Sequence, residues 1–331
     1  MRAVRCLRHG EPAEYDEILS VDEVPDPVPG PGEVIVAVEA AAVNFPDLLL
    51  VAGRYQVPVA VPFVPGSEFA GVVLDTGRGV DTVAVGTAVA GTTMSGAFAE
   101  RVAVPAGAVR SLPPGSDPVA AAAGGVALRT AYSALHPVAG VRPGEWVAVP
   151  GAAGGVGSAA TLVARAAGAR VLAVASSPAK AAFCADLGAD AVIDLSATGD
   201  VRRAVRDLTG GVDVVVDPVG GPLAELLIRT MRRGGRFVTV GYASGEIPRI
   251  PLNLVLLKGV TLLGFDMRAQ AEEDPEGAER DAAAVAALVG RGLQVPVTAR
   301  LPLARAREAL RLVADRTAMG KVLLITRSEG S

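Results

Sequence analysis

A glycine-rich segment near the middle of the chain has the residue types and spacing to bind a phosphate group. It reads VAVPGAAGGVGS (147–158), so that Gly151, Gly154 and Gly157 recur at every third position. It follows a strand-like apolar run and precedes an Ala-rich helical run, the context in which backbone amides approach a pyrophosphate at a helix N-terminus. The alternative is a tight turn without a ligand. We predict a dinucleotide-binding loop with contacts from Ala153, Gly154, Gly155, Val156 and Gly157.

The end of the next predicted strand indicates which dinucleotide this loop takes. A carboxylate about 20 residues after the loop binds the free ribose 2′-hydroxyl of NADH. This chain has Ser176, Ser177 and Lys180 there instead, two hydroxyls and an ammonium that suit a 2′-phosphate. Only three residues of the chain are lysines, against 28 arginines, so Lys180 does not follow from composition. We predict NADPH; the alternative is a solvated lysine in the first turn of a helix.

Composition and charge exclude several other classes of protein. The chain has 331 residues, of which 50% are hydrophobic, and a mean hydropathy of +0.41. Its longest charge-free stretch (146–164) contains Pro150 and four glycines and is poor in Leu, Ile and Phe, so we predict no membrane span. The net charge of −4 gives no basic surface for nucleic acid. No apolar run marks the N-terminus for export, and we expect a cytoplasmic protein.

The cysteines and histidines do not have metal-ligand spacing. Cys6 and Cys184 are isolated, which favours buried thiols over a disulfide framework or a structural zinc site. His9 and His136 lie far from any ligand pattern, and we expect surface or capping roles for both.

The pattern of predicted secondary structure differs between two parts of the chain. In the first third, short apolar runs such as 33–42 and 71–74 lie between glycines and prolines, which is typical of a small barrel or sandwich. From Trp146 onward, apolar strands alternate with helical segments, which indicates a parallel sheet with crossover helices. The strands are predicted at 147–150, 170–175, 191–194, 212–217, 236–241 and 260–265. We expect a solvated loop over the acidic stretch 268–281, then a helix at 304–315 and a strand at 321–325.

Several longer segments resemble the medium-chain dehydrogenase/reductase superfamily, most of all its zinc-free quinone oxidoreductase branch, which includes zeta-crystallin. The resemblance covers nearly the whole chain. It rests on PGPGEVIVAVEAAAVNFPDLLLVAGRY (29–55), PGSEFAGVV (65–73), ALRTAYSAL (127–135), AAGGVGSAA (152–160), DPVGG (217–221) and VGYASGEIPRIPLNLVLLKG (240–259). It implies an α/β protein in which a GroES-like β-rich catalytic domain (1–122) is rejoined by the C-terminal segment (295–331). A doubly wound Rossmann domain that binds NADPH (123–294) is inserted between them.

The resemblance also implies which residues form the site. Zinc-dependent relatives have a cysteine at the position of Asn44 and a histidine at that of Ser67, so only Glu68 of this set remains and we expect no metal. Asn44 and Thr130 match positions near the nicotinamide and its phosphates, and Tyr55 lines the substrate cleft. Further cofactor contacts are implied for Ser176, Ser177, Lys180, Val219, Gly241, Tyr242, Phe265 and Arg316. Leu195 stands where some relatives place a tyrosine against the adenine.

The residues themselves leave other roles open for two of these side chains, and they offer two roles for Asp47. Asn44 could cap a turn, and Tyr55 could be a partly buried aromatic of the barrel. Asp47 could polarise a ligand or cap a helix that begins near Pro46.

Without a metal, the expected chemistry is transfer of a hydride from nicotinamide to an acceptor that tolerates negative charge. Quinones and α,β-unsaturated carbonyl compounds meet that requirement. The alternatives are an enoyl-thioester (acyl-CoA) reductase and a non-catalytic NADPH-binding protein. The apolar run 258–264 matches the strand through which zinc-free relatives pair, and an exposed apolar sheet edge is avoided in proteins, so we expect a homodimer.

Overall fold

The computed structural model describes residues 1–326, and the chain divides into two compact units. The first unit comprises Met1–Val126 and Pro296–Ser331, and the second comprises Ala127–Val295. Within the described residues, no helix combines the length and the apolar character needed to cross a membrane.

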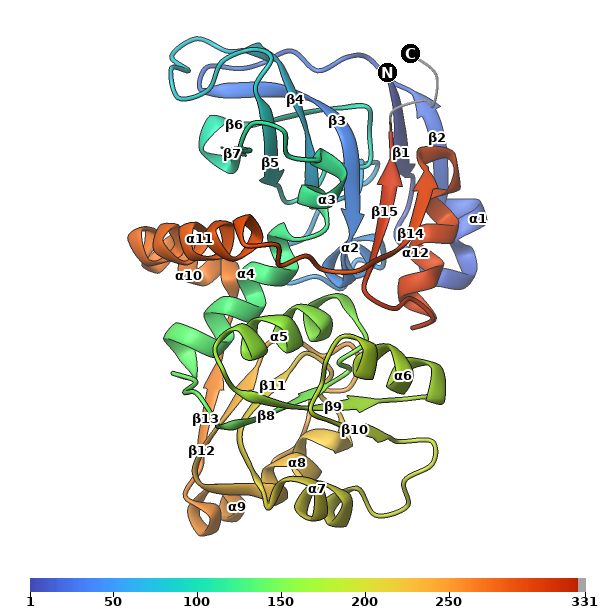
Figure 1. The fold of residues 1–331 in the computed structure, drawn as a ribbon. Coiled ribbons are helices and arrows are strands. Elements are labelled where there is room, and N and C mark those ends of the chain that lie inside the picture. The colour runs from blue at the N-terminus through green and yellow to red at the C-terminus, as the bar shows by residue number, and fades with distance from the viewer. Residues whose placement is uncertain (327–331) are drawn as a thin grey trace. The chain divides into compact units, whose positions relative to one another are not determined.

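The first unit is built on β-strands from both ends of the chain. Its strands are β1 (Arg2–Cys6), β2 (Leu19–Glu23), β3 (Glu33–Val43), β4 (Glu68–Thr76), β5 (Ala88–Thr92), β6 (Arg101–Pro105), β7 (Val109–Ser111), β14 (Val297–Pro302) and β15 (Lys321–Ile325). Seven of them form one sheet in the order β14-β15-β3-β4-β5-β7, with β6 also paired to β3 (Figure 1). The long strand β3 is central because it pairs with β4, β6 and β15, all antiparallel.

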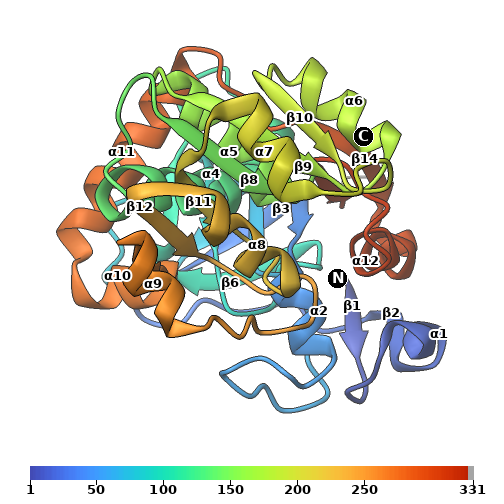
Figure 2. The same ribbon diagram turned by 90° about the horizontal axis from the view of Figure 1, so that it is seen from below.

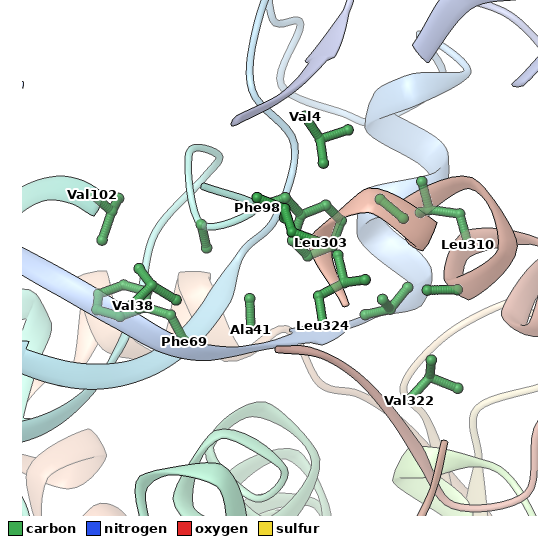
Figure 3. Close-up of a cluster of buried hydrophobic side chains, with 14 of the residues drawn as sticks. Val4, Val38, Ala41, Phe69, Phe98, Val102, Leu303, Leu310, Val322 and Leu324 are labelled. Atoms are coloured by element: carbon green, nitrogen blue, oxygen red, sulfur yellow. The ribbon is translucent and has the colours of Figure 1, made fainter. Parts of the chain in front are cut away.

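Among the described residues, four short α-helices complete the first unit. They are α1 (Tyr15–Ile18), α2 (Phe45–Val51), α3 (Pro118–Ala122) and α12 (Ala306–Ala314). Side chains from distant parts of the sequence share one core, in which Phe69 and Phe98 from the N-terminal part lie with Leu303 and Leu324 from the C-terminal part (Figure 3). The C-terminal strands β14 and β15 therefore pack into the β-rich unit.

The second unit contains a six-stranded, entirely parallel sheet. Its strands are β8 (Trp146–Pro150), β9 (Arg170–Ala175), β10 (Ala191–Asp194), β11 (Val212–Asp217), β12 (Met231–Thr239) and β13 (Thr261–Gly264), in the order β10-β9-β8-β11-β12-β13. Its helices are α4 (Gly125–Ser133, continued by a π-helical turn at Ala134–Val138), α5 (Gly155–Ala166), α6 (Pro178–Asp186), α7 (Val201–Thr209), α8 (Pro222–Thr230), α9 (Leu252–Lys258), α10 (Met267–Glu273) and α11 (Pro275–Gly290).

Helices cover both faces of this parallel sheet. Within the unit, α5 and α6 lie on one face of the sheet, and α7, α8 and α9 lie on the other (Figure 1). Figure 2 shows the same sheet from below, with α7 and α8 in front of it. Central strand residues such as Val147, Leu172 and Val215 are fully buried, as strands covered on both faces must be. The predicted doubly wound α/β fold with a β-rich domain is confirmed.

One predicted segment is wrong. The acidic stretch 268–281 is not a loop but belongs to α10 and α11. Its flanking aspartates are helix caps: Asp266 accepts hydrogen bonds from the amides of residues 268 and 269, and Asp274 accepts one from Gly277 before Pro275 opens α11. Within α10, Arg268 pairs with Glu272 one turn later. The charges therefore mark helix starts and helical neighbours rather than a solvated loop.

The two cysteines agree with the prediction. Cys6 and Cys184 are both buried and free. Burial raises the pKa of each thiol to about 11, so neither is a thiolate at neutral pH.

Candidate functional site

The glycine loop occupies the turn between β8 and α5. Gly151 follows the strand with a left-handed φ of +62°, and its carbonyl oxygen accepts a hydrogen bond from Gly154 N at 2.9 Å. A Cβ on Gly157 would overlap that same carbonyl oxygen and the backbone of Ala152, so only glycine permits this close turn. Helix α5 begins at Gly155, and its first amides have no partner within the helix. The loop thus presents backbone donors at a helix N-terminus, which suits a phosphate group.

The end of β9 carries the hydroxyls and the ammonium expected for a 2′-phosphate. Ser177 is the N-cap of α6, and its hydroxyl oxygen accepts a hydrogen bond from Lys180 N at 3.4 Å. The Lys180 ammonium donates to Ser176 Oγ at 3.2 Å. The sequence prediction did not include this capping role of Ser177. The structure brings Ser176, Ser177 and Lys180 together one strand away from the glycine loop.

The loops after β11, β12 and β13 contain the remaining predicted residues of the second unit. Asp217 Oδ1 accepts hydrogen bonds from Val219 N at 2.8 Å and Gly220 N at 2.9 Å, which fixes the DPVGG turn. Val219 lies against the glycine loop, because a Cβ on Gly151 would come 2.7 Å from Val219 Cγ2. Burial raises the pKa of Asp217, whose Oδ2 has no hydrogen-bond partner in the described residues.

The other predicted residues follow the next two strands of the sheet: Gly241 and Tyr242 come after β12, and Phe265 comes directly after β13. The Tyr242 ring packs near Gly220, and Phe265 N donates to the carbonyl oxygen of Thr239 at 3.1 Å. Leu195 follows β10, where its amide donates to Ala175 O at 2.9 Å. The predicted cofactor residues of the second unit therefore gather at the carboxyl edge of its parallel strands, the edge at which open α/β sheets bind ligands. Thr130, half-buried on α4, is the exception.

In the first unit, Asn44 belongs to a buried polar cluster at the start of α2. Lys321 Nζ donates to Asn44 Oδ1 at 2.6 Å and to Glu68 Oε2 at 3.0 Å, and Asn44 Nδ2 donates to the same Glu68 oxygen at 2.9 Å. The other Glu68 oxygen accepts from Val126 N at 2.7 Å. Lys321 and Glu68 are only 3% and 1% exposed.

Asp47 lies in the same cluster. Asn44 is the N-cap residue of α2, and its backbone N–H donates to Asp47 Oδ2 at 2.8 Å. Asp47 therefore has the helix-capping role that its sequence position left open. Burial raises the pKa of Asp47 to about 7, and the hydrogen bonds from Asn44 and Ser67 and the charge of Lys321 only partly offset this effect. The carboxyl is fully buried, and its Oδ1 has no partner in the described part of the chain.

Two predicted residues of the first unit lie outside this cluster. Tyr55 is half-buried in the segment after α2. Arg316 follows α12 with a left-handed φ of +56° and an exposed side chain. The sequence prediction missed Lys321, for which the available signals were the rarity of lysine in the chain and its place at the head of an apolar run.

The residues at the position of the catalytic zinc in zinc-dependent relatives do not fit a metal ion. Zinc needs three protein ligands at a catalytic site, whereas the Glu68 carboxylate and the Asn44 amide of this cluster are both bonded to the Lys321 ammonium, a cation in the place of the metal. Across the described residues, no group of three or more His, Cys, Asp and Glu side chains is placed to hold a metal.

Known protein families cover most of the chain. The family model for the alcohol dehydrogenase GroES-like domain matches residues 30–114, and the model described as zinc-binding dehydrogenase matches residues 155–300.

Individual relatives are similar over nearly the whole chain. The quinone oxidoreductase-like protein 2 homolog of Nematostella vectensis is 32% identical over 98% of this chain and 89% of its own length. A mycocerosic acid synthase-like polyketide synthase of Mycobacterium tuberculosis is 33% identical over 93% of this chain, which corresponds to 15% of that protein. The quinone oxidoreductase of Thermus thermophilus, solved also in complex with NADPH, is 34% identical. Its TM-score is 0.82, and the alignment covers 98% of this chain and all of that one.

Proposed function

Because the chain belongs to the quinone oxidoreductase family of medium-chain dehydrogenases/reductases, we propose that it is an NADPH-dependent oxidoreductase. Its acceptor is a quinone or an α,β-unsaturated carbonyl compound. The observation that carries this proposal is the glycine loop of β8 and α5 with Ser176 and Lys180 at the end of the next strand. A similar protein solved with NADPH supports the same choice of cofactor.

The residues present fit NADPH. The backbone of residues 153–157 would hold the pyrophosphate at the N-terminus of α5, and Ser176, Ser177 and Lys180 would hold the 2′-phosphate. Val219, Gly241, Tyr242 and Phe265 are the proposed contacts of the nicotinamide side, and Arg316 is proposed near the adenosine phosphate. When bound, the reduced nicotinamide supplies the hydride.

We assign orientation of the reacting groups to Asn44, Tyr55 and Thr130. Asn44 is the best supported of the three, because its side chain is held by two charged groups inside the protein. A fixed polar group contributes to catalysis by holding the reactants in one arrangement. We propose that the proton that follows the hydride comes from solvent.

A metal has no part in this proposal. The ammonium of Lys321 lies among Asn44 and Glu68, the positions from which a zinc site would draw its ligands. Turnover should therefore be unchanged after prolonged treatment with a chelator. A loss of activity that added zinc restores would contradict a metal-free reaction.

A second candidate function is the reduction of an enoyl thioester. The similarity of the chain to a stretch of a polyketide synthase favours it, because polyketide chains are carried as thioesters and the same hydride transfer would reduce their conjugated double bond. A protein that binds NADPH without catalysis is the remaining alternative.

One assay separates these functions. NADPH consumption by the purified protein is measured with 1,4-benzoquinone, a simple enone and crotonyl-CoA as acceptors. Turnover with the quinone or the enone supports the proposal, and turnover with crotonyl-CoA alone favours the second candidate. Binding of NADPH without turnover of any acceptor would leave the non-catalytic role.

We further propose that the chain forms a homodimer through β13, in the cytoplasm. Strand β13 is an edge of the parallel sheet and pairs only with β12 among the described residues. Next to it lies an apolar hollow lined by Phe237, Tyr242, Ile247, Pro248 and Leu262, among others. Leu252 and Leu256 on α9 are 76% and 77% exposed, and apolar surface of this kind marks an interaction site. Light scattering at micromolar concentration tests the mass, and a monomer would contradict the proposal.

A further inference from the structure

Lys321 is the most buried of the three lysines, and its charge is compensated inside the protein. It opens β15, and its ammonium donates to Asn44 Oδ1 and Glu68 Oε2. A buried ammonium persists only when it is paired and hydrogen-bonded. The Glu68 carboxylate supplies the opposite charge, and its second oxygen is taken by the amide of Val126.

This ion pair determines how the Asn44 amide is oriented. The ammonium has only donors and the carboxylate has only acceptors. Asn44 therefore has to present Oδ1 to Lys321 and Nδ2 to Glu68, as observed. The flipped amide would place its NH₂ group against the ammonium and its oxygen against the carboxylate, so both contacts would be repulsive.

We propose that Lys321 is a positioning residue for Asn44: with Glu68, it holds the Asn44 side chain in one rotamer and one amide orientation for hydride transfer. The inference rests on the proposed function, in which Asn44 orients the reacting groups. Lys321 is not itself a catalytic residue, because its side chain is 3% exposed and it acts through Asn44.

A purely structural role is the competing explanation. Lys321, Glu68 and Asn44 join β15, β4 and the end of β3, so the cluster could serve only to connect three strands. The two explanations differ when the charge pair is removed as a whole. Lys321→Met alone leaves the Glu68 carboxylate buried without its partner, whereas Lys321→Met with Glu68→Gln leaves no uncompensated charge.

The test measures stability and kinetics in the same set of variants. We expect Lys321→Met to lower both the unfolding midpoint and kcat. In Lys321→Met/Glu68→Gln the midpoint should recover while kcat stays roughly 10- to 100-fold below wild type, because the two charges that disfavour the flipped Asn44 amide are then absent. KM for NADPH should change less than kcat. Arg300→Met, which removes an exposed cation from the neighbouring strand β14, is the control and should change neither property.

Asn44→Ala provides a second criterion. In a protein that already carries Asn44→Ala, adding Lys321→Met and Glu68→Gln should reduce kcat by less than about 2-fold further. The effects of substitutions at residues that act as a unit are not additive. An equal loss in both backgrounds would mean that Lys321 and Glu68 do not act through Asn44 and would overturn the inference.

A readout independent of catalysis comes from the amide itself. The chain has two asparagines, Asn44 and the exposed Asn253, so selective ¹⁵N-asparagine labelling gives two side-chain NH₂ signals, and Asn44→Ala assigns them. In the wild-type protein the Asn44 signal should be sharp and slow to exchange with water. In Lys321→Met/Glu68→Gln it should broaden or exchange faster, while Asn253 stays unchanged.

The outcomes separate the inference from the proposed function. A wild-type protein that oxidises NADPH with none of the acceptors would overturn the proposed function and the inference with it. If the wild type is active, two results would overturn the inference alone. One is a wild-type kcat in the folded Lys321→Met/Glu68→Gln variant, and the other is an Asn44 signal that is unchanged in that variant.

Discussion

The buried carboxyl of Asp47 should make the folding stability of the chain fall as the pH rises from about 4 to about 7. Burial raises its pKa to about 7 from an ordinary value of 3.8, so the folded state binds the proton more tightly than the unfolded state does. The resulting stabilisation is complete below about pH 4 and is lost as the pH rises towards 7. An ion-paired aspartate, with a lowered pKa, would show the opposite trend.

Asp47→Asn isolates this effect because asparagine is neutral at every pH and keeps an oxygen that can accept from Asn44 N. The pKa of Asp47 differs by about three units between the folded and unfolded states. At about 1.4 kcal/mol per unit, this difference corresponds to a stabilisation of the folded state by about 4 kcal/mol at low pH. When the pH is raised from about 5 to about 8, the unfolding free energy of the wild type should therefore fall by roughly 2–3 kcal/mol relative to that of Asp47→Asn.

The assay is urea unfolding followed by circular dichroism at both pH values. Because the chain has two units that can unfold separately, hydrogen exchange of the segment 44–51, corrected for the intrinsic rate, reports the local stability of α2. Asp75→Asn, at an exposed position of β4, is the matched control and should show no such pH dependence. A stability difference between Asp47→Asn and wild type that does not change with pH would mean that Asp47 does not have a raised pKa in the folded protein.

Three further predictions concern the cofactor site and the sheet edge. Lys180→Ala should reduce the preference for NADPH over NADH in kcat/KM by about 10- to 100-fold, since a charge-assisted hydrogen bond contributes about 1.5–3 kcal/mol; an unchanged ratio would contradict the 2′-phosphate assignment. Gly157→Ala should weaken NADPH binding by more than about 10-fold in a fluorescence titration, because the new Cβ overlaps the Gly151 carbonyl. Gly199→Ala, which meets no atom within 4 Å, should not weaken binding. Leu262→Lys on β13 should lower the mass in light scattering to that of one chain.

The parts of the fold that the sequence predicted best are those with local signals. The runs 170–175, 191–194 and 212–217 coincide with β9, β10 and β11, because strands buried on both faces must be continuously apolar. The glycine loop was also predictable from a local signal, because the strand, the turn and the helix N-terminus follow one another directly in the sequence.

The cluster around Asn44 depends instead on contacts between residues far apart in the sequence. Lys321 is 277 residues from Asn44 and 253 residues from Glu68, and no pattern within one window of sequence joins them. Lysine at the head of the apolar strand 321–325 was a visible anomaly, but its partners emerge only when β3, β4 and β15 pair. The capping role of Asp47 was among those that its sequence position allowed, whereas its burial depends on the same tertiary packing.

The error over 268–281 has a different cause. The density of charges in this stretch is typical of a solvated loop, whereas the positions of the charges indicate helices. At Asp274-Pro275 the aspartate is the N-cap and the proline opens the helix, and the oppositely charged Arg268 and Glu272, four residues apart, are neighbours on a helix surface.

Metal-free, NADPH-dependent reduction is tested most directly by the initial rate of 1,4-benzoquinone reduction by the chelator-treated wild-type protein, with NADPH and NADH compared side by side. Turnover should need no added metal, and kcat/KM for NADPH should be at least about 10-fold above that for NADH. Turnover that prefers NADH, or that appears only when zinc is added, would contradict it.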